Sequence, residues 1–156
     1  MKKRKTIALV AHDNRKKDLV EWAEFNVAIL TDYDMICTGT TGTLVETALR
    51  AKLSDDPEGK LHVTKLKSGP LGGDQQMGAL ICDGKIDYLI FLWDPMEPQP
   101  HDVDVKALLR IASVYNIPTA TNRSTADFII SSPLMGSDYH PIIKNFSEYL
   151  NRVVGL

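Results

Sequence analysis

Short apolar runs rich in β-branched residues alternate along the chain with longer amphipathic stretches. Runs such as Ile7–Val10 and Leu89–Trp93 are continuously apolar, which is typical of strands buried on both faces of a sheet. The longer stretches have helical periodicity, most clearly where Val105, Leu108 and Ala112 share one face. The pattern predicts strands at Thr6–Ala11, Met35–Thr38, Leu61–Leu66, Tyr88–Trp93 and Pro118–Thr121, and helices at Lys16–Leu30, Thr43–Ala51, Gln75–Asp83 and Val103–Tyr115.

This alternation of strands and helices implies an α/β fold in which helices wrap a parallel sheet. No repeat, low-complexity tract or linker interrupts the pattern, and Ser54–Lys60 is a polar turn. A length of 156 residues fits one domain with a real core, so we expect residues 1–156 to form a single domain.

The composition is that of an ordinary globular protein, with 44% apolar and 24% charged residues. A net charge of −2 gives no reason to expect nucleic acid or a membrane surface as a partner. Cys37 and Cys82 lie in apolar surroundings without metal-ligand spacing, and we interpret both as reduced core thiols. No segment approaches the length of a membrane span and no signal peptide is recognised, so a cytoplasmic location is expected.

Most of the chemically capable residues follow the predicted strands. In open α/β sheets, ligands bind at the carboxyl ends of the strands, so these residues are expected to meet at one edge. The opposite loops carry residues typical of turns, and this asymmetry favours an active site. The segments that follow the strands are His12-Asp13-Asn14, Gly39–Gly42, Ser68–Asp74, Asp94-Pro95, His101-Asp102 and Asn122.

The segment Gly69–Gln76 places one carboxylate, Asp74, behind three glycines and a proline at the start of a predicted helix. Glycines allow the backbone to approach a ligand closely, so Asp74 is a candidate catalytic base. The alternative is a turn that ends in a helix cap. The helix start favours the charged form of this carboxyl group. Closeness to the substrate and exclusion of water must then supply its reactivity as a base.

The segment Thr38–Gly42 (Thr-Gly-Thr-Thr-Gly) joins a predicted strand to a helix. Backbone amides at a helix start bind phosphate well, and Lys16 from the neighbouring loop supplies a cation. The spacing matches neither the P-loop nor the dinucleotide-binding fingerprint. A tight turn with an N-cap is the alternative interpretation.

Two histidines, His12 and His101, each precede an aspartate, and Asp104 lies three residues past His101. A histidine can polarise a carbonyl group or shuttle protons, and a carboxylate can orient it. Asp102 also fits as a helix cap, and Asp94 fits either a site residue or a turn before proline. A metal site is the weaker alternative, because no pair of histidines is spaced for binding from one rigid element.

Together these motifs resemble those of the methylglyoxal synthase family. The resemblance implies a single-domain three-layer fold with a five-stranded parallel sheet flanked by helices, of Rossmann- or flavodoxin-like architecture. It also implies no cofactor, no metal and a cytoplasmic homohexamer. The stretch Ala51–Lys67 is longer than the family pattern leads us to expect. The similar segments are Ala8–Asp13, Thr38–Gly42, Ser68–Ile81, Lys85–Pro95, Pro100–Arg110 and Asn116–Ile130.

The resemblance also implies roles for individual residues. Asp74 is similar to the catalytic base, and His12 and His101 occupy the histidine positions associated with the carbonyl and enediolate oxygens. The remaining candidates are Lys16, Thr38, Gly39, Thr40, Thr41, Ser68 and Gly69 for substrate and phosphate, Asp13 and Asp104 as acidic site residues, Asp94 beside them, and Arg152 as an arginine that reaches an adjacent subunit's site.

The implied reaction is a carbon–oxygen lyase reaction that converts dihydroxyacetone phosphate into methylglyoxal and inorganic phosphate through an enediolate. Inorganic phosphate is then both a product and a candidate inhibitor. The leading alternative is a non-catalytic module that binds phosphorylated effectors. Such a module would not need Asp74, His101 and Asp104 together. A metal-dependent phosphohydrolase and a triose phosphate isomerase are further alternatives, which the products of the reaction distinguish.

Overall fold

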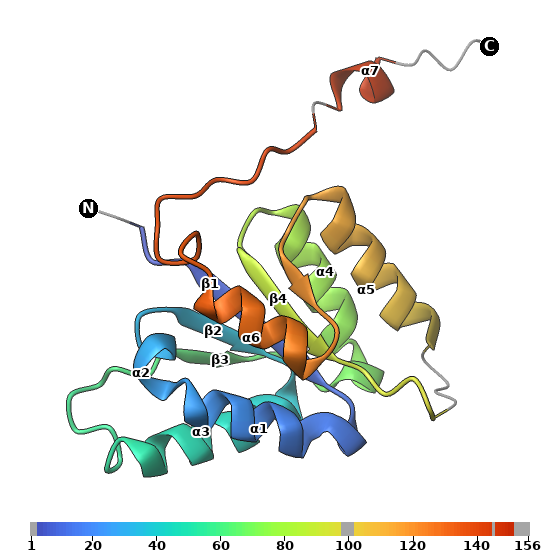
Figure 1. The fold of residues 1–156 in the computed structure, drawn as a ribbon. Helices are drawn as coiled ribbons and strands as arrows, with labels where there is room; N and C mark the ends of the chain where they lie inside the picture. Colours follow the sequence, from blue (N-terminus) through green and yellow to red (C-terminus); the bar gives the residue numbers. More distant parts are fainter. Residues whose placement is uncertain (1–2, 98–101, 145, 152–156) are drawn as a thin grey trace.

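The computed structural model describes residues 3–97, 102–144 and 146–151, and its centre is a five-stranded sheet (Figure 1). The strand order is β3-β2-β1-β4-β5 and every neighbouring pair is parallel. The prediction of a five-stranded parallel sheet is confirmed. The strands are β1 (Thr6–Ala11), β2 (Asp34–Cys37), β3 (Val63–Lys65), β4 (Tyr88–Leu92) and β5 (Thr119–Ala120).

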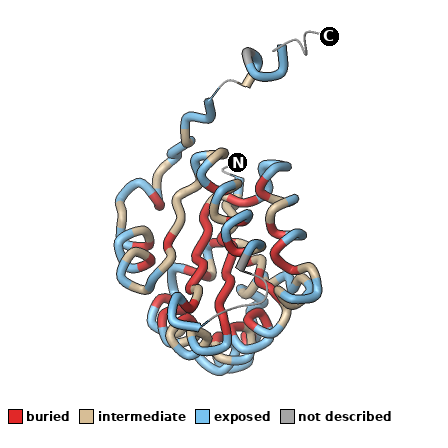
Figure 2. The backbone as a smooth tube through the Cα atoms, turned by 90° about the vertical axis from the view of Figure 1, so that its right-hand side faces the viewer, coloured by how far each residue is buried: buried red, intermediate tan, exposed pale blue. Residues whose placement is uncertain are grey.

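Helices cover both faces of the sheet, which gives three layers. On one face lie α1 (Lys16–Phe25), α2 (Val27–Leu30), α3 (Gly39–Lys52) and α6 (Arg123–Ser131), and on the other lie α4 (Gly73–Cys82) and α5 (Asp102–Val114). Successive β1 residues alternate between the layers: Ile7 and Leu9 face the first, and Ala8 and Val10 face the second. The central strands are therefore buried on both sides (Figure 2), as their continuous apolar runs predict.

Three shorter elements complete the described part of the chain. Two 3-10 turns, η1 (Asp13–Arg15) and η2 (Gly69–Leu71), follow β1 and β3. After α6 the chain runs away from the sheet to α7 (Ser147–Leu150), which lies outside the three layers (Figure 1). None of the described helices is both long and apolar enough to cross a bilayer.

Several boundaries differ from the predictions. The helix expected at Thr43–Ala51 begins four residues earlier, at Gly39, and the strand expected at Leu61–Leu66 is reduced to Val63–Lys65. The helix expected at Lys16–Leu30 is interrupted at Asn26, whose side-chain amide donates to the carbonyl oxygen of Trp22 at 2.8 Å. A side-chain bond of this kind competes with the helical hydrogen bonds and ends α1.

The long connection between α3 and β3 contains a tight turn. Ser54, Asp55 and Asp56 adopt positive φ angles of 53°, 66° and 55°. The Asp56 carboxylate accepts hydrogen bonds from the backbone amides of Lys60 at 2.7 Å and Leu61 at 2.9 Å. These bonds close the turn and hold the pKa of Asp56 below its ordinary value.

The two cysteines differ in their surroundings. Cys37 is buried at the end of β2, and burial raises the pKa of its thiol to about 12. Cys82 ends α4 and is exposed, so the prediction of a core thiol is wrong at this position. Its neighbour Ile81 faces the core, together with Met77 of the same helix.

We therefore expect an aromatic disulfide reagent to modify one thiol per native chain and two per unfolded chain. The thiolate is the reacting form, and the Cys37 thiol is both inaccessible and hard to ionise. The measurement is reagent absorbance with and without guanidinium chloride. Cys82→Ser should abolish the reaction of the native chain, and equal rates at both thiols in the wild type would contradict the assignment.

Candidate active site

A pocket of about 550 Å³ opens at the carboxyl ends of β1 and β2. The chain leaves β1 toward β2 on one side, and β4 lies on the other side of β1. This change of direction is where open α/β sheets bind ligands. The lining residues are Val10, Ala11, His12, Asp13, Lys16, Thr38, Thr40, Thr41, Ser68, Gly69, Pro70, Asp74 and Glu97.

The start of α3 forms one wall of this pocket. Gly39 is the first helical residue, so the amides of Thr40 and Thr41 lie in the first turn, where a helix provides no acceptor of its own. The Thr38 hydroxyl donates to the Thr41 hydroxyl at 3.5 Å, which donates to the carbonyl oxygen of Ala11 at 3.4 Å. Both hydroxyls can rotate toward an anion. Amides, hydroxyls and the helix dipole together suit a phosphate group.

Lys16 supplies a positive charge beside this wall. Its ammonium group donates to the Asp13 carboxylate three residues earlier, across η1. That hydrogen bond, with the attraction between the two charges, holds the pKa of Asp13 below its ordinary value. Asp13 is largely exposed on the rim and Lys16 is mostly buried, so the pair places the cation inside the pocket and the carboxylate at its mouth.

Asp74 lies in the first turn of α4 and is only 4% exposed, although it lines the pocket. The turn before it includes Gly72, whose φ of +108° is a conformation that favours glycine. A Cβ on Gly69 would lie 3.4 Å from Asp74 Oδ1, so this carboxylate lies directly against the Gly69 backbone. The glycine-rich segment thus turns a buried carboxylate toward the pocket.

Gly73 is required by close packing of two backbone segments. A Cβ at this position would lie 2.0 Å from the carbonyl oxygen of Lys67, far inside van der Waals contact. The Gly73 amide also donates to the carbonyl oxygen of Ser68 at 2.9 Å. This contact fixes the distance between the end of β3 and the start of α4, and so places Ser68 and Asp74 in the same pocket.

We expect Gly73→Ala to lower the free energy of unfolding by about 3 kcal/mol, because the clash is with backbone that cannot rotate away. Gly78→Ala in the same helix is the matched control. The nearest atom to its added Cβ is Ile111 Cγ2 at 4.0 Å, so alanine should raise stability there by up to about 1 kcal/mol. Urea denaturation followed by circular dichroism measures both, and equal effects would contradict this account.

His12 follows β1 and is 8% exposed. Its Nδ1 accepts a hydrogen bond from the backbone amide of Asp94 at 3.0 Å. A nitrogen that accepts carries no proton, so the neutral ring has its proton on Nε2. The ring also contacts the Phe91 ring edge-on, with centroids 5.4 Å apart. These contacts fix the orientation of His12 and make its Nε2–H a hydrogen-bond donor.

Asp94 holds the His12 ring through its backbone amide, and it does not line the pocket itself. Its carboxylate accepts from Asn14 Nδ2 at 3.0 Å and from the Met96 amide at 3.0 Å, and Arg15 lies 3.9 Å away. The hydrogen bonds from Asn14 and Met96 are the main causes that hold the pKa of Asp94 below its ordinary value. The ionised carboxylate fixes the turn whose amide holds the His12 ring.

The pocket thus brings together candidates from three parts of the chain, after β1, β2 and β3, and some candidates lie elsewhere. Gly39 lies beside the pocket, where a Cβ would approach the carbonyl oxygen of Leu66 to 3.0 Å. Asp104 is half-buried in the first turn of α5 and is not among the described lining residues. His101 and Arg152 lie outside the described residues.

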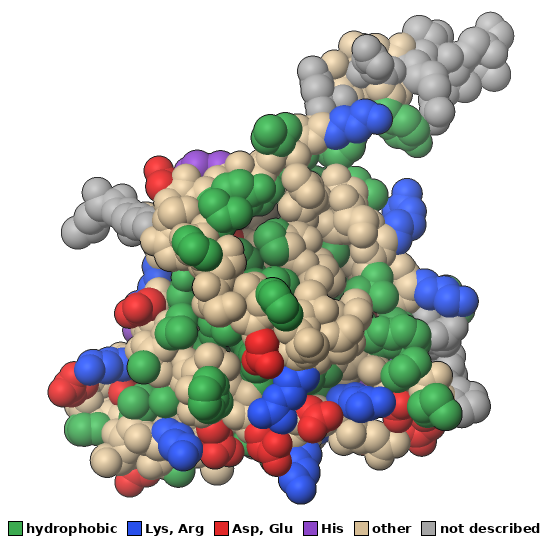
Figure 3. Space-filling model, viewed as in Figure 1, with side chains coloured by type: hydrophobic (Ala, Val, Ile, Leu, Met, Phe, Trp, Pro, Cys, Tyr) green, Lys and Arg blue, Asp and Glu red, His purple; other side chains and the backbone are tan. Residues whose placement is uncertain are grey.

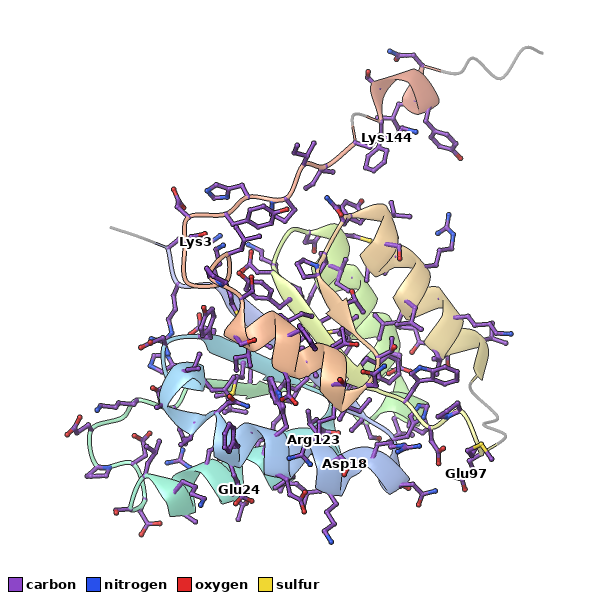
Figure 4. All side chains as sticks on the ribbon, in the orientation of Figure 1. Lys3, Asp18, Glu24, Glu97, Arg123 and Lys144 are labelled. Atoms are coloured by element: carbon purple, nitrogen blue, oxygen red, sulfur yellow. The ribbon has the colours of Figure 1, made fainter. Side chains whose placement is uncertain are left out.

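Glu97 is a lining residue that sequence reasoning missed. It lies at the end of the described segment after β4, at the edge of the molecule (Figure 4). Its carboxylate accepts from Asn14 Nδ2 at 2.9 Å. Its position after a strand at the carboxyl edge is the signal that could have included it.

The arrangement has the parts for proton abstraction next to a carbonyl in a phosphorylated substrate. It offers a phosphate subsite, a buried carboxylate and a neutral imidazole donor in one pocket. Among the described residues, no cluster of three or more histidine, cysteine, aspartate or glutamate side chains could hold a metal ion.

Comparisons with known proteins agree on one family. The family model described as the MGS-like domain matches residues 18–121. A methylglyoxal synthase from Maridesulfovibrio salexigens is 54% identical over 155 residues, which cover 97% of this chain and 99% of that one. A methylglyoxal synthase from Coxiella burnetii is 50% identical over 150 residues, which cover 96% and 98%. The crystal structure of methylglyoxal synthase from Elizabethkingia anophelis NUHP1 superposes with a TM-score of 0.84, at 48% identity over 97% of this chain and 93% of that one. The chain therefore belongs to the methylglyoxal synthase family.

Proposed function

We propose that the chain is a carbon–oxygen lyase that converts dihydroxyacetone phosphate into methylglyoxal and inorganic phosphate, with Asp74 as the base. The observation that carries this proposal is the buried Asp74 carboxylate in the same pocket as Lys16 and the first turn of α3. The relatives that carry the name methylglyoxal synthase cover nearly the whole chain, which supports the same reaction.

In this proposal the substrate phosphate binds at the start of α3. The amides of Thr40 and Thr41, the hydroxyls of Thr38 and Thr41, and the Lys16 ammonium group surround it. Gly39 gives the helix its close approach to the end of β3, and Ser68 and Gly69 form the neighbouring wall. The phosphate anchor fixes the other two carbons of the substrate within reach of Asp74.

Asp74 then removes a proton from the hydroxymethyl carbon, and the electron pair forms an enediolate with the neighbouring carbonyl. The Nε2–H of His12 donates to the oxygen that becomes negative, and His101 is proposed as a second donor. The hydroxyl on the carbon that was deprotonated next loses its own proton and becomes the oxygen of an aldehyde. The carbon–carbon double bond shifts to the carbon that carries the phosphate, and the bond between that carbon and the phosphate oxygen breaks. The enol that remains takes a proton on its CH₂ carbon to give methylglyoxal. Asp13 and Asp104 are candidate proton carriers in these transfers.

The test is to incubate the purified chain with dihydroxyacetone phosphate and excess chelator. Methylglyoxal and phosphate should appear in equal amounts, because the proposed residues need no metal. A triose phosphate isomerase would form glyceraldehyde 3-phosphate and retain the phosphate, and a phosphohydrolase would form dihydroxyacetone. Either of those products in place of methylglyoxal would overturn the proposal. Inorganic phosphate should inhibit competitively, since it shares the phosphate subsite with the substrate.

The alternative, a non-catalytic module that binds phosphorylated effectors, is not favoured. The relatives named as enzymes match 97% and 96% of this chain, and no part of their length beyond a few residues is left unmatched. A binding module would also have no use for a carboxylate buried at the reacting end of the substrate. Phosphate binding without turnover would be the result that revives this alternative.

We further propose that the chain forms a homohexamer in which Arg152 contributes to an adjacent subunit's site. Large apolar side chains are exposed over α6 and the segment after it (Figure 3), among them Phe128, Ile142 and Leu150, at 78%, 86% and 77%. Exposed apolar side chains in such number favour association with another surface. Light scattering should give six times the 17.3 kDa of one chain, and a monomer mass would contradict the proposal.

A further inference from the structure

We propose that Glu97, oriented by Asn14, is a specificity-determining residue that excludes three-carbon phosphates whose carbon farthest from the phosphate is a carboxylate. This inference rests on the proposed function, because it concerns the substrate that the same pocket selects. It assigns a purpose to a pair of residues that the proposed reaction steps do not use.

The two ends of the pocket lie on opposite sides of β1. The phosphate residues Thr38, Thr40 and Thr41 lie between the end of β2 and the first turn of α3. Glu97 follows β4, and β1 lies between β2 and β4 in the sheet. His12 extends from the end of β1 between these two sides. In the proposed reaction His12 donates to the carbonyl oxygen of the substrate, so a substrate with its phosphate at α3 extends toward the side on which Glu97 lies.

Asn14 holds the Glu97 carboxylate in place. Its amide nitrogen donates one hydrogen to Glu97 Oε2 at 2.9 Å and the other to Asp94 Oδ2 at 3.0 Å. An NH₂ group has two donors, and both are used here. Asp94 is itself anchored by the Met96 amide, so Glu97 is tied to a fixed part of the fold although its side chain lies at the surface.

The charges along the pocket then differ from one end to the other. Lys16 is the only lysine or arginine among the described lining residues, and it belongs to the phosphate end. Apart from Asp13, whose carboxylate pairs with Lys16, the carboxylates of the lining are those of Asp74 and Glu97. Asp74 is needed for proton abstraction, whereas Glu97 adds negative charge without a step in the reaction. A second anionic group on the substrate would meet this charge and be repelled.

Two ligands of equal length isolate this effect. Glycerol 3-phosphate ends in a neutral hydroxymethyl group, as dihydroxyacetone phosphate does, and 3-phosphoglycerate ends in a carboxylate. Calorimetry gives the Kd of each, and the ratio of the two measures discrimination against the carboxylate. Glu97→Gln should lower this ratio about five- to tenfold, since it removes one charge and keeps an oxygen that accepts from Asn14.

Two further variants sharpen the test. Glu58→Gln makes the same change of charge before β3, at the opposite edge of the sheet, and should change the ratio by less than about twofold. Asn14→Ala keeps the Glu97 charge but releases it, and should lower the ratio about two- to threefold. An unchanged ratio in Glu97→Gln, or an equal change in Glu58→Gln, overturns the inference. An unchanged ratio in Asn14→Ala would mean that Asn14 does not orient Glu97 for this discrimination.

Failure of the proposed function would be seen separately. Binding is measured without turnover, so the ratio reports on Glu97 whether or not methylglyoxal is formed. Wild-type protein that binds glycerol 3-phosphate but releases no methylglyoxal from dihydroxyacetone phosphate overturns the lyase proposal and leaves the test of Glu97 intact.

Discussion

Asp74→Asn is expected to lower kcat for methylglyoxal formation by about 10³- to 10⁴-fold. The amide has the shape of the carboxylate but cannot accept a proton from carbon, so the first step loses its base. The burial of this side chain leaves little room for water to replace it, because only 4% of the residue is exposed. Steady-state turnover measured by methylglyoxal release gives the effect, and the Kd of inorganic phosphate should change little.

The control is Asp83→Asn, at the other end of the same helix. Asp83 is exposed and follows the last residue of α4, so its replacement by asparagine should leave kcat within about twofold of the wild type. Both variants should fold. At most about 1 kcal/mol is lost when a negative charge is removed from the first turn of a helix. A residual rate above one tenth of the wild type in Asp74→Asn would remove Asp74 as the base.

The layers of the fold could be predicted because burial on both faces of a strand is visible in the residues of that strand alone. The run Ile7–Val10 is apolar at every position, and the two faces of β1 pack against different layers of helices. Continuous burial is the property that separates a central parallel strand from a half-exposed one. The order of the strands and helices along the chain follows from the sequence itself. Because ligands bind at the carboxyl ends of parallel strands, His12, Thr38 and Asp74 are predicted to lie at one edge of the sheet.

The start of α3 was placed too late because local preference and tertiary contact disagree. Glycine and threonine have low helix propensity, so the sequence predicts a loop from Gly39 to Gly42. In the structure the Gly39 amide donates to the carbonyl oxygen of Lys67 at 3.2 Å, and glycine is the residue that fits this close approach. The contact joins residues far apart in the sequence, so no local pattern predicts it.

Helix α6 was missed for a different reason. Asn122 caps it, since its side-chain oxygen accepts from the Thr125 amide at 2.9 Å, and this was a readable start signal. The serine and threonine that follow are typical of loops, and they obscured the apolar face made by Ala126 and Ile130. The capping residue was the better guide.

The connections around His12 could not be predicted at all. The Asp94 amide that fixes its ring lies 82 positions away in the sequence, and the Asn14–Glu97 bond spans 83. The sequence showed two histidines beside aspartates and suggested that a neighbouring carboxylate orients each ring. In the structure a backbone amide holds the His12 ring, and the carboxylate of Asp94 accepts hydrogen bonds that fix the turn carrying this amide.

This geometry predicts losses of kcat of different size for two substitutions of His12. His12→Asn keeps an oxygen at the position of Nδ1, which can accept from the Asp94 amide, but it loses the donor at Nε2. His12→Gln places an amide donor near the position of Nε2 and loses the acceptor. If the donor stabilises the enediolate oxygen, His12→Asn should lower kcat by about 10²- to 10³-fold and His12→Gln by only about tenfold.

The Michaelis constant distinguishes this role from a loss of binding. A donor that acts mainly on the charge formed during the reaction should change kcat and kcat/KM together and leave KM nearly constant. His140→Asn is the control, since that histidine is exposed and contacts Asp138 at 3.1 Å, away from the lining of the pocket. Equal losses in His12→Asn and His12→Gln would mean that the orientation of the segment after β1, and not the Nε2–H donor, is what the reaction requires of His12.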